Sequence, residues 1–362
     1  MARTLLTLLL AGLVAVSGAA VAGKHGASKS NRAGVAKSAN ADRTALTWRG
    51  DVASSRGVGT DIARAWQASG HGPIQVVSFN TISGIDAVAG GQADMAGSAR
   101  PAYAKRAEES GLTFTPVAWD GLVMIAHARN PVAGISLKQL HDVYFGKITN
   151  WKQLGGNDAP INLYSVASPL DGIEYSLREL LFKRGDQPVA APRLYMNTAK
   201  LEEAVTLDPN GFGVTTLSGA RENDKLRMLP VEGVRPTPSA VADGSYPLYT
   251  PLYVVSRDGG PHAATVRAFL DFLQGDRAKA ILREHGLLPY ADGLALANQR
   301  DDHLAWVDAR VRGVTPMNGP LAAPRATYSA QSSIAPTSER TTEARQRAEK
   351  SRRKSGDKDD GN

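Results

Sequence analysis

Short apolar runs alternate with amphipathic stretches through residues 46–316. The apolar runs predict β-strands at residues 45–48, 74–79, 94–97, 117–127, 161–166 and 249–256. The amphipathic stretches predict helices at residues 62–66, 84–89, 137–145, 175–182, 266–273 and 278–284. Strands that alternate with helices are typical of α/β units and mostly parallel sheets. The pattern therefore predicts an α/β fold.

The alternating segment is longer than a single hydrophobic core usually accommodates, so we expect two lobes. In α/β sheets, ligands bind at the carboxyl ends of the strands, where helices begin. The first backbone N–H groups of a helix are unpaired and its dipole is positive there, so these helix starts suit anions. A ligand site is therefore expected where several strands end.

The N-terminal region differs from this segment in composition. Arg3, the apolar residues 5–16 and the A-x-A pattern at residues 20–22 form the layout of a secretory signal peptide. We predict a signal peptide at residues 1–22, a flexible leader at residues 23–43, and a mature protein that is soluble in the periplasm or secreted. A membrane anchor is the alternative interpretation. Neither a stop-transfer pattern nor a cysteine that could carry a lipid supports it, so we expect no stable membrane insertion.

Positive charge is concentrated at the ends of the chain. The net charge is +7, of which residues 1–45 carry +5 and residues 317–362 carry +3, so the segment between them is close to neutral. Nucleic-acid binding requires basic residues that cluster on a folded face, so nucleic acid is not an expected partner. Residues 317–362 lack apolar periodicity and are rich in Ser, Thr and charged residues, which predicts a disordered basic tail.

Motifs that carry catalytic chemistry are scarce. The seven histidines are scattered without H-x-x-x-H spacing, and the absence of cysteine excludes thiolate metal sites and cysteine nucleophiles. Gly57-Val58-Gly59 lacks the third glycine of a dinucleotide-binding loop, and no G-x-S-x-G nucleophile elbow occurs. We therefore expect a protein that is not an enzyme and that holds neither a metal ion nor a cofactor.

Four segments together resemble the phosphate-binding protein family of bacterial ABC transporters. The most specific is V-Y-F-G-K-I-T-N-W at residues 143–151, followed by L-G-G at residues 154–156. The others are S-G-I through S-A-R-P at residues 83–101, W-D-G-L-V at residues 119–123, and Y-P-L at residues 246–248 with the segment 269–289. A single short motif of this kind is weak evidence, but the four together cover roughly residues 45–290.

The resemblance implies the type II periplasmic-binding-protein fold, in which two α/β lobes are joined by two crossover strands around a ligand cleft. Lobe one would comprise residues 44–117 and 250–316, and lobe two residues 118–249. The hinges would lie within the strands at residues 117–127 and 248–256, and a ligand would close the cleft by a hinge motion.

The same resemblance implies a function. The chain would be an exported, monomeric solute-binding protein that binds phosphate or a related oxyanion and delivers it to an ABC permease. The alternative is a degenerate family member that acts as an envelope or secreted interaction protein without high-affinity phosphate binding. The long basic tail favours this alternative, because a transport receptor has no need of one.

The resemblance also indicates seven ligand-binding residues at two helix starts and nearby: Thr81, Ser83, Gly84, Ser98, Arg100, Asp171 and Gly172. Ordinary helix capping is the alternative for the residues at each of the two helix starts. Arg100 and Arg56 are candidates for a cation that compensates the charge of an anion. Asp120, which lies inside an apolar strand, is interpreted as a hydrogen-bonded hinge carboxylate, with a buried switch as the alternative.

Three positions depart from the family pattern. Val166 stands where the family has a phosphate-binding Arg, and Asp171 stands where it has a Ser. Ala99 falls at or near the position of an acidic residue that accepts the ligand's proton. A carboxylate that faces phosphate in a desolvated cleft would repel it, so we expect phosphate to bind weakly or not at all.

Overall fold

The computed structural model describes residues 43–311, which lie within one compact unit. No helix among these residues is both long enough and apolar enough to cross a membrane. The predicted signal peptide, the predicted tail and all of the predicted leader except Arg43 lie outside the described residues.

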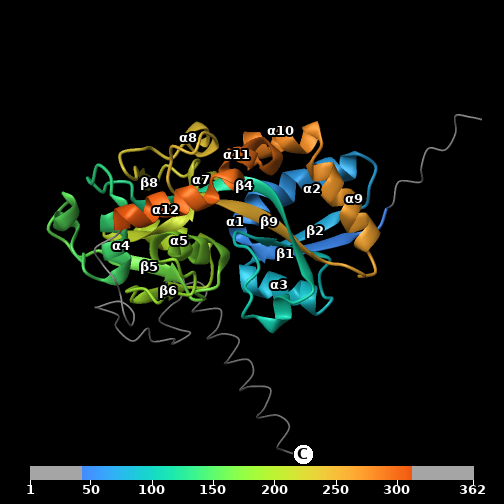
Figure 1. The fold of residues 1–362 in the computed structure, drawn as a ribbon, viewed down its shortest axis with the longest axis horizontal. Helices are drawn as coiled ribbons and strands as arrows, with labels where there is room; N and C mark the ends of the chain where they lie inside the picture. Colours follow the sequence, from blue (N-terminus) through green and yellow to red (C-terminus); the bar gives the residue numbers. More distant parts are fainter. Residues whose placement is uncertain (1–42, 312–362) are drawn as a thin grey trace, which may run out of the picture. The chain divides into compact units, whose positions relative to one another are not determined.

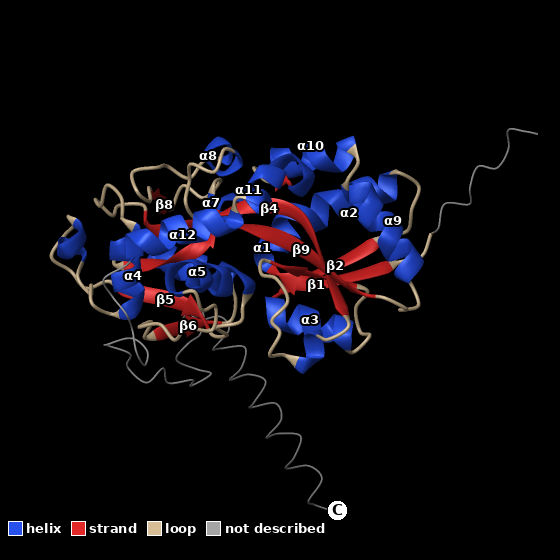
Figure 2. Ribbon diagram, viewed as in Figure 1, coloured by secondary structure: helices blue, strands red, loops and turns tan. Residues whose placement is uncertain are grey.

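Lobe one is a sheet with helices on both faces (Figure 2). Its strands are β1 (Leu46–Asp51), β2 (Ile74–Phe79), β3 (Met95–Ser98), the first half of β4 (Leu112–His127), β9 (Tyr249–Arg257) and β10 (Leu288–Pro289). Its helices and helical turns are α1 (Val52–Ser54), η1 (Ser55–Gly59), α2 (Thr60–Ala68), α3 (Thr81–Ala89), η2 (Ala107–Glu109), α9 (Ala263–Leu273), α10 (Asp276–Glu284), η4 (Tyr290–Gly293) and α11 (Leu294–Asn298). The strand order is β2-β1-β3-β9-β4. Helix α3 packs on one face, and α2 and α9 pack on the other (Figure 2).

Lobe two continues the same sheet in the order β4-β7-β5-β6, with β8 also paired to β4. Its strands are the second half of β4, β5 (Asn162–Val166), β6 (Arg193–Tyr195), β7 (Gly211–Thr216) and β8 (Leu226–Leu229). Its helices and helical turns are α4 (Leu137–Phe145), η3 (Trp151–Leu154), α5 (Gly172–Phe182), α6 (Thr198–Leu207), α7 (Leu217–Ala220) and α8 (Pro238–Ala242).

Strands β4 and β9 run side by side between the lobes (Figure 1). The predicted arrangement of two α/β lobes with two crossover strands is therefore confirmed. The expectation of mostly parallel pairing is wrong. Pairs β1–β2, β1–β3, β5–β6 and β5–β7 are parallel, but every pair that includes β4 or β9 is antiparallel. The chain crosses between the lobes in both directions, and a run of apolar residues does not encode the direction of its strand.

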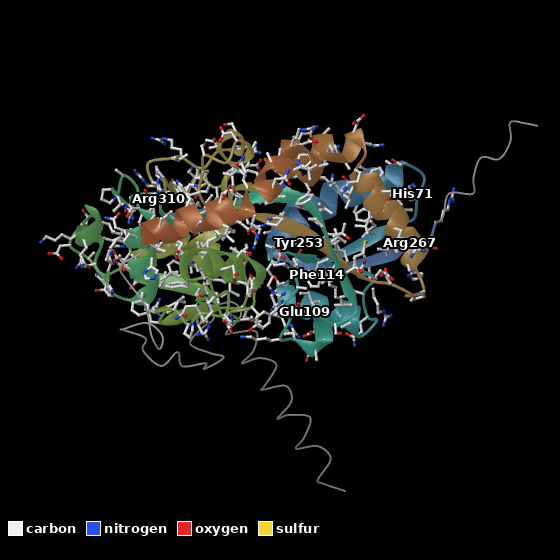
Figure 3. The ribbon with its side chains drawn as sticks, in the orientation of Figure 1. His71, Glu109, Phe114, Tyr253, Arg267 and Arg310 are labelled. Carbon is white, nitrogen blue, oxygen red and sulfur yellow. The ribbon has the colours of Figure 1, made fainter. Side chains whose placement is uncertain are left out.

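Aromatic side chains organise the core of lobe one. Trp48 and Trp66 pack edge-on against Phe269, with ring centroids 6.5 and 5.5 Å apart. Phe114 on β4 and Tyr253 on β9, which are only partly buried, also pack against each other, with ring centroids 6.3 Å apart (Figure 3). Edge-to-face pairs of this kind add to the stabilisation that burial of the rings already provides.

The segment 143–151 shapes a turn and fixes a core tryptophan in lobe two. Gly146 ends helix α4 with a φ of 84°, the left-handed conformation that favours glycine at a helix end. Trp151 then packs edge-on against Phe212 at 5.4 Å, and its indole N–H donates a hydrogen bond to the carbonyl of Asn210 at 3.0 Å. The most specific motif of the sequence therefore serves the fold of lobe two.

Asp120 lies on β4 at the point where the strand leaves its pairing with β9 and begins to pair with β7. Its carboxylate accepts hydrogen bonds from the backbone N–H of Ser218, at 3.2 Å, and from the Ser218 hydroxyl. Burial raises the pKa of Asp120 to about 7, and the hydrogen bonds from Ser218 oppose that rise. Asp120 is therefore a buried, hydrogen-bonded carboxyl group, as interpreted from the sequence, and its role in a hinge stays a prediction.

Helix α12 (Arg300–Val311) follows lobe one in sequence but packs on lobe two, where it contacts α4 and α5 (Figure 1). Lys183 of lobe two pairs with Asp308 of this helix at 2.9 Å, and Val307 and Val311 are buried. Figure 3 shows Arg310 near the end of the helix, over lobe two. The lobe boundaries drawn from the sequence stay a prediction, and a helix that they place in lobe one forms contacts with lobe two.

Candidate functional site

Three helix starts meet where the two lobes face each other. Helix α1 begins after β1 at Asp51, α3 begins after β2 at Asn80, and α5 begins after β5 at Asp171. Strands β1 and β2 are parallel neighbours, so two of these helix starts lie at the same edge of the sheet in lobe one. Hydrogen bonds between the first turns join the two lobes at this point, as expected for a site at strand ends.

Thr81 is the residue through which the lobes are joined. Its hydroxyl oxygen accepts a hydrogen bond from the backbone N–H of Gly172 at 2.8 Å, and its own backbone N–H donates to Asp171 Oδ2 at 3.3 Å. A Cβ atom on Gly172 would lie 2.7 Å from the backbone nitrogen of Ala99 and 3.0 Å from Thr81 Oγ1. The start of α5 therefore packs closely against lobe one, and the cleft is closed here.

Asp51 supplies the first carboxyl group of the site. Its Oδ1 atom accepts a hydrogen bond from the backbone N–H of Ser54 at 2.7 Å, which caps α1, and its Oδ2 atom accepts one from the Thr81 hydroxyl at 3.4 Å. Burial raises the pKa of Asp51, and hydrogen bonds from Ser54, Thr81 and the backbone of Ala99 oppose that rise. The side chain is 1 % exposed, so the ionised form has little access to water.

Asp171 supplies the second carboxyl group. It holds the N-cap position of α5, and its backbone carbonyl accepts a hydrogen bond from the N–H of Tyr175 at 2.8 Å, but its side chain forms no hydrogen bond with that helix. The side chain instead accepts one from the backbone N–H of Thr81 in the other lobe. Burial raises the pKa of Asp171 to about 7, and the negative charges of Asp51 and Glu174 contribute to the rise. No described residue forms a hydrogen bond with the buried Oδ1 atom. The simple capping interpretation of Asp171 is therefore incomplete.

Two other predicted residues serve the start of α3. The backbone N–H of Ser83 donates to Asn80 Oδ1 at 2.9 Å, and the Ser83 hydroxyl donates to the carbonyl of Asn80 at 3.1 Å. Asn80 is therefore the residue that caps α3, which the sequence interpretation missed. A Cβ on Gly84 would lie 2.6 Å from the Cα of Gly50, so Gly84 allows α3 to pack closely on β1.

Ser98 and Arg100 form a buried structural group beside the site. Arg100 donates to both carboxylate oxygens of Glu109, at 2.9 and 2.5 Å, and its Nε donates to the carbonyl of Leu170 at 2.8 Å. The Ser98 hydroxyl donates to the carbonyl of Arg100 at 2.8 Å. The guanidinium charge is thus neutralised by Glu109. Arg100 contacts lobe two through the backbone carbonyl of Leu170 and the ring of Tyr175, whose centroid lies 5.7 Å from Arg100 Cζ.

Arg56, the other candidate cation, lies at the rim of the cleft. It pairs with Glu202 of lobe two at 2.8 Å, and 43 % of its side chain is exposed. A pocket of about 450 Å³ surrounds this pair, with Arg64 and His285 from lobe one and Glu222 from lobe two in its lining. Arg56 therefore bridges the lobes at the rim, where it has its own carboxylate partner.

A second buried ion pair lies beneath the start of α5. Arg178 donates to Glu174 Oε2 at 3.0 Å and to the Ser165 hydroxyl at 2.7 Å, while Glu174 Oε1 accepts a hydrogen bond from the backbone N–H of Val166 at 3.2 Å. Val166 itself is 3 % exposed. Val166, at the position where the family has a phosphate-binding Arg, is thus a core side chain. The nearby guanidinium of Arg178 is already paired with Glu174.

The sequence interpretation missed several further residues of the site. Asp51 was not among the predicted site residues, although it is the last residue of β1, at a strand end where site residues are expected. Ser176 donates to the carbonyl of Ala99 at 2.7 Å and accepts from Thr250, so it joins the lobes. The i, i+4 spacing of Glu174 and Arg178 was the available signal for their pair. Across residues 43–311, no cluster of three or more potential metal ligands is found.

Comparison with known proteins places these features in a family. The model of the PBP superfamily domain matches residues 39–277. The phosphate-binding protein PstS of Bacillus subtilis (strain 168) is 28 % identical over 300 residues, which cover 80 % of this chain and 95 % of that protein. Protein SphX of Synechococcus elongatus is 28 % identical over 240 residues, which cover 61 % of this chain and 70 % of that protein.

Solved structures agree with the fold. A phosphate ABC transporter substrate-binding protein from Clostridium perfringens, with bound phosphate, aligns with a TM-score of 0.60 and 26 % identity over 68 % of this chain and 99 % of that one. An ABC-type phosphate transport receptor from Vibrio cholerae aligns with a TM-score of 0.52 and 25 % identity over 68 % of this chain and all of the other. The resemblance and the type II periplasmic-binding fold expected from the sequence are both confirmed.

Proposed function

This chain belongs to the PBP superfamily, and on that premise we propose that it is an exported solute-binding protein that takes phosphate or a related oxyanion into its interlobe cleft. The similar proteins from B. subtilis and V. cholerae are described as a phosphate-binding protein and a phosphate transport receptor. An ABC permease is the partner that this proposal implies. The relatives are binding proteins, and binding is the activity proposed here.

One observation carries the proposal: hydrogen-bond donors from both lobes converge at a single point. Gly172 at the start of α5 and Thr81 at the start of α3 each donate a backbone N–H across the contact between the lobes, Gly172 to Thr81 Oγ1 and Thr81 to Asp171 Oδ2. Backbone N–H groups at helix starts are a preferred environment for phosphate and similar anions. An oxyanion there would contact both lobes and hold them closed.

The affinity for phosphate should nevertheless be low. Val166 replaces the guanidinium that the family resemblance predicts, and loss of one charge-assisted hydrogen bond costs about 1.5–3 kcal/mol, or roughly one to two decades of affinity. Asp171 adds a carboxyl group that occupies the N–H of Thr81. A bound oxyanion would have to displace this carboxyl group from that donor.

The alternative function is an envelope or secreted interaction protein that retains the fold without high-affinity anion binding. The observation in its favour is that Asp51 and Asp171 bond to the donors at the starts of α1 and α3. In this alternative the carboxyl groups take the place of the ligand permanently. The two functions differ in whether an added oxyanion can compete with Asp171.

Calorimetric titration of phosphate and of sulfate into the protein tests the proposal. We expect weak, saturable binding by at least one of these oxyanions. Thr81→Val should weaken it several-fold, because valine keeps the shape of threonine and the backbone N–H but removes the hydroxyl. Ser239→Ala, at the edge of lobe two, serves as the matched control and should leave binding unchanged. Absence of binding by both oxyanions at millimolar concentration would favour the interaction protein.

A further inference from the structure

We propose that a proton retained by one of the two carboxyl groups of Asp51 and Asp171 takes the place of a cation in the interlobe cleft, so that lobe closure and oxyanion binding are both coupled to proton uptake. The part that concerns closure stands on the described residues alone. The part that concerns oxyanion binding rests on the proposed function.

The first support is geometric. The carboxyl groups come from opposite lobes and share Thr81, whose hydroxyl bonds Asp51 at 3.4 Å and whose N–H bonds Asp171 at 3.3 Å. Both side chains are 1 % exposed. Two buried carboxylates that share one site cannot both ionise without strong repulsion, so one of them retains a proton. Asp171 Oδ1 is buried and lacks a hydrogen-bond partner among the described residues. A negative charge on this atom would be stabilised least, so the proton is expected there.

The surrounding charges leave the pair without a counter-ion. Glu174 faces Asp171 from α5 but is paired with Arg178 at 3.0 Å. Arg100 faces Asp171 from the segment after β3 but is paired with Glu109 at 2.5 Å. Each ion pair is neutral as a unit, so the charge of the site is set by the two aspartates themselves. Burial raises the pKa of each of them, that of Asp171 to about 7.

Closure should therefore depend on pH. Below neutral pH, the pair holds at least one proton, and the closed arrangement carries little uncompensated charge. As pH rises past neutrality, the last proton leaves, and two negative charges face each other across the cleft. Separation of the lobes then relieves the repulsion, because water enters and solvates both carboxylates.

The affinity for an oxyanion should depend on the same protonation. A bound anion adds negative charge to a site that already contains two carboxyl groups, so binding is favourable only when those groups are protonated. A protonated carboxyl group also becomes a hydrogen-bond donor to the anion. If binding takes up one proton from solvent, the apparent affinity changes by about tenfold per pH unit in the range where the pair titrates.

Small-angle X-ray scattering from about pH 5 to about pH 9 tests the closure part. The unmodified protein should be compact at the acid end and gain radius of gyration above neutral pH. Asp171→Asn should remain compact throughout, because the amide is isosteric and never charged. Asp271→Asn, at an exposed position, is the matched control and should behave as the unmodified protein. Asp120→Asn tests whether the buried carboxyl group of β4 contributes to this pH dependence. This variant should still show the increase in radius of gyration above neutral pH.

Titration with sulfate tests the binding part, because sulfate does not itself change charge over this range. We expect its affinity for the unmodified protein to fall about tenfold per pH unit toward alkaline pH, and its affinity for Asp171→Asn to be nearly independent of pH. Equal pH profiles for the two proteins, in scattering and in titration, would overturn the proposal. Absence of sulfate and phosphate binding at every pH would overturn the proposed function and the binding part, while the scattering transition would still decide the closure part.

Discussion

The backbone N–H of Thr81 in lobe one donates a hydrogen bond to Asp171 Oδ2 in lobe two at 3.3 Å. This N–H belongs to the first residue of α3, where a bound oxyanion would be expected. The chain therefore presents one of its own carboxyl groups to the donor that the ligand needs. Asp171 acts as an internal competitor for the site, and this relationship explains why low phosphate affinity and a closed cleft are expected together.

Substitution of Gly172 by alanine should prevent full closure. The added Cβ would lie 2.7 Å from the backbone nitrogen of Ala99, and a backbone atom cannot move aside as a flexible side chain can. We expect a larger radius of gyration at acid pH and weaker oxyanion binding. Gly260→Ala is the control, because the nearest atom to its Cβ is 3.6 Å away. An unchanged scattering profile for Gly172→Ala would show that the lobes do not need this contact.

The Arg100–Glu109 pair should be essential for stability. Both side chains are almost completely buried, and removal of one partner from a buried ion pair typically costs about 3–5 kcal/mol. Glu109→Gln should therefore lower the free energy of unfolding in urea by an amount of that order. Asp158→Asn weakens the exposed pair with Lys152 and should leave the free energy of unfolding nearly unchanged. Similar small effects of both substitutions would contradict the assigned role of Arg100.

Much of the fold was predictable because apolar periodicity is strong. The strand at residues 74–79 and the helix at residues 137–145 match β2 and α4 residue for residue. Elements that lack a clear pattern were missed, among them α6 and β7, and so was the packing of α12 on lobe two, which depends on contacts far apart in sequence.

The candidate site was predictable in part. Thr81, Asp171 and Gly172 were found through the resemblance, and the structure brings them together. The partners of the charged residues were not predictable, because ion pairing depends on the three-dimensional structure. Arg56 pairs with Glu202, and Arg100 pairs with Glu109.

Two truncations should differ in their effect on the melting temperature. Deletion of residues 320–362, whose composition lacks apolar periodicity, should leave the melting temperature nearly unchanged. Deletion from residue 300 onward also removes α12, whose Val307 and Val311 are buried. Burial of each valine side chain contributes about 1.5–3 kcal/mol, so this second protein should melt several degrees lower. A large drop in melting temperature on deletion of residues 320–362 would contradict this prediction and show that this segment packs against the two lobes.

Stability should also depend on pH through Asp120. Its pKa in the folded state is about 7, above the ordinary value of 3.8, so the folded state binds more protons than the unfolded state between these values. The free energy of unfolding should therefore fall by about 1.4 kcal/mol per pH unit as pH rises from about 4 to about 7. Asp120→Asn should remove this contribution, and Asp243→Asn, at an exposed position, should not. Identical slopes in urea unfolding for Asp120→Asn and the unmodified protein would contradict the assignment.

The central claim is that Asp171 occupies an oxyanion site of the phosphate-receptor type. Asp171→Ser frees the N–H of Thr81 and removes a negative charge, and it should strengthen phosphate binding by at least about tenfold. Addition of Val166→Arg to that variant should strengthen binding further, because it supplies a guanidinium near the start of α5. If the added Arg fails to fold into the core, the single variant still decides the question.

Calorimetric titration of phosphate at neutral pH into the unmodified protein and into Asp171→Ser is the most direct measurement. We predict a dissociation constant well above the micromolar range for the unmodified protein and a clear gain in affinity for the variant. Sub-micromolar binding by the unmodified protein, or no gain in the folded variant, would contradict the claim that Asp171 competes for the site.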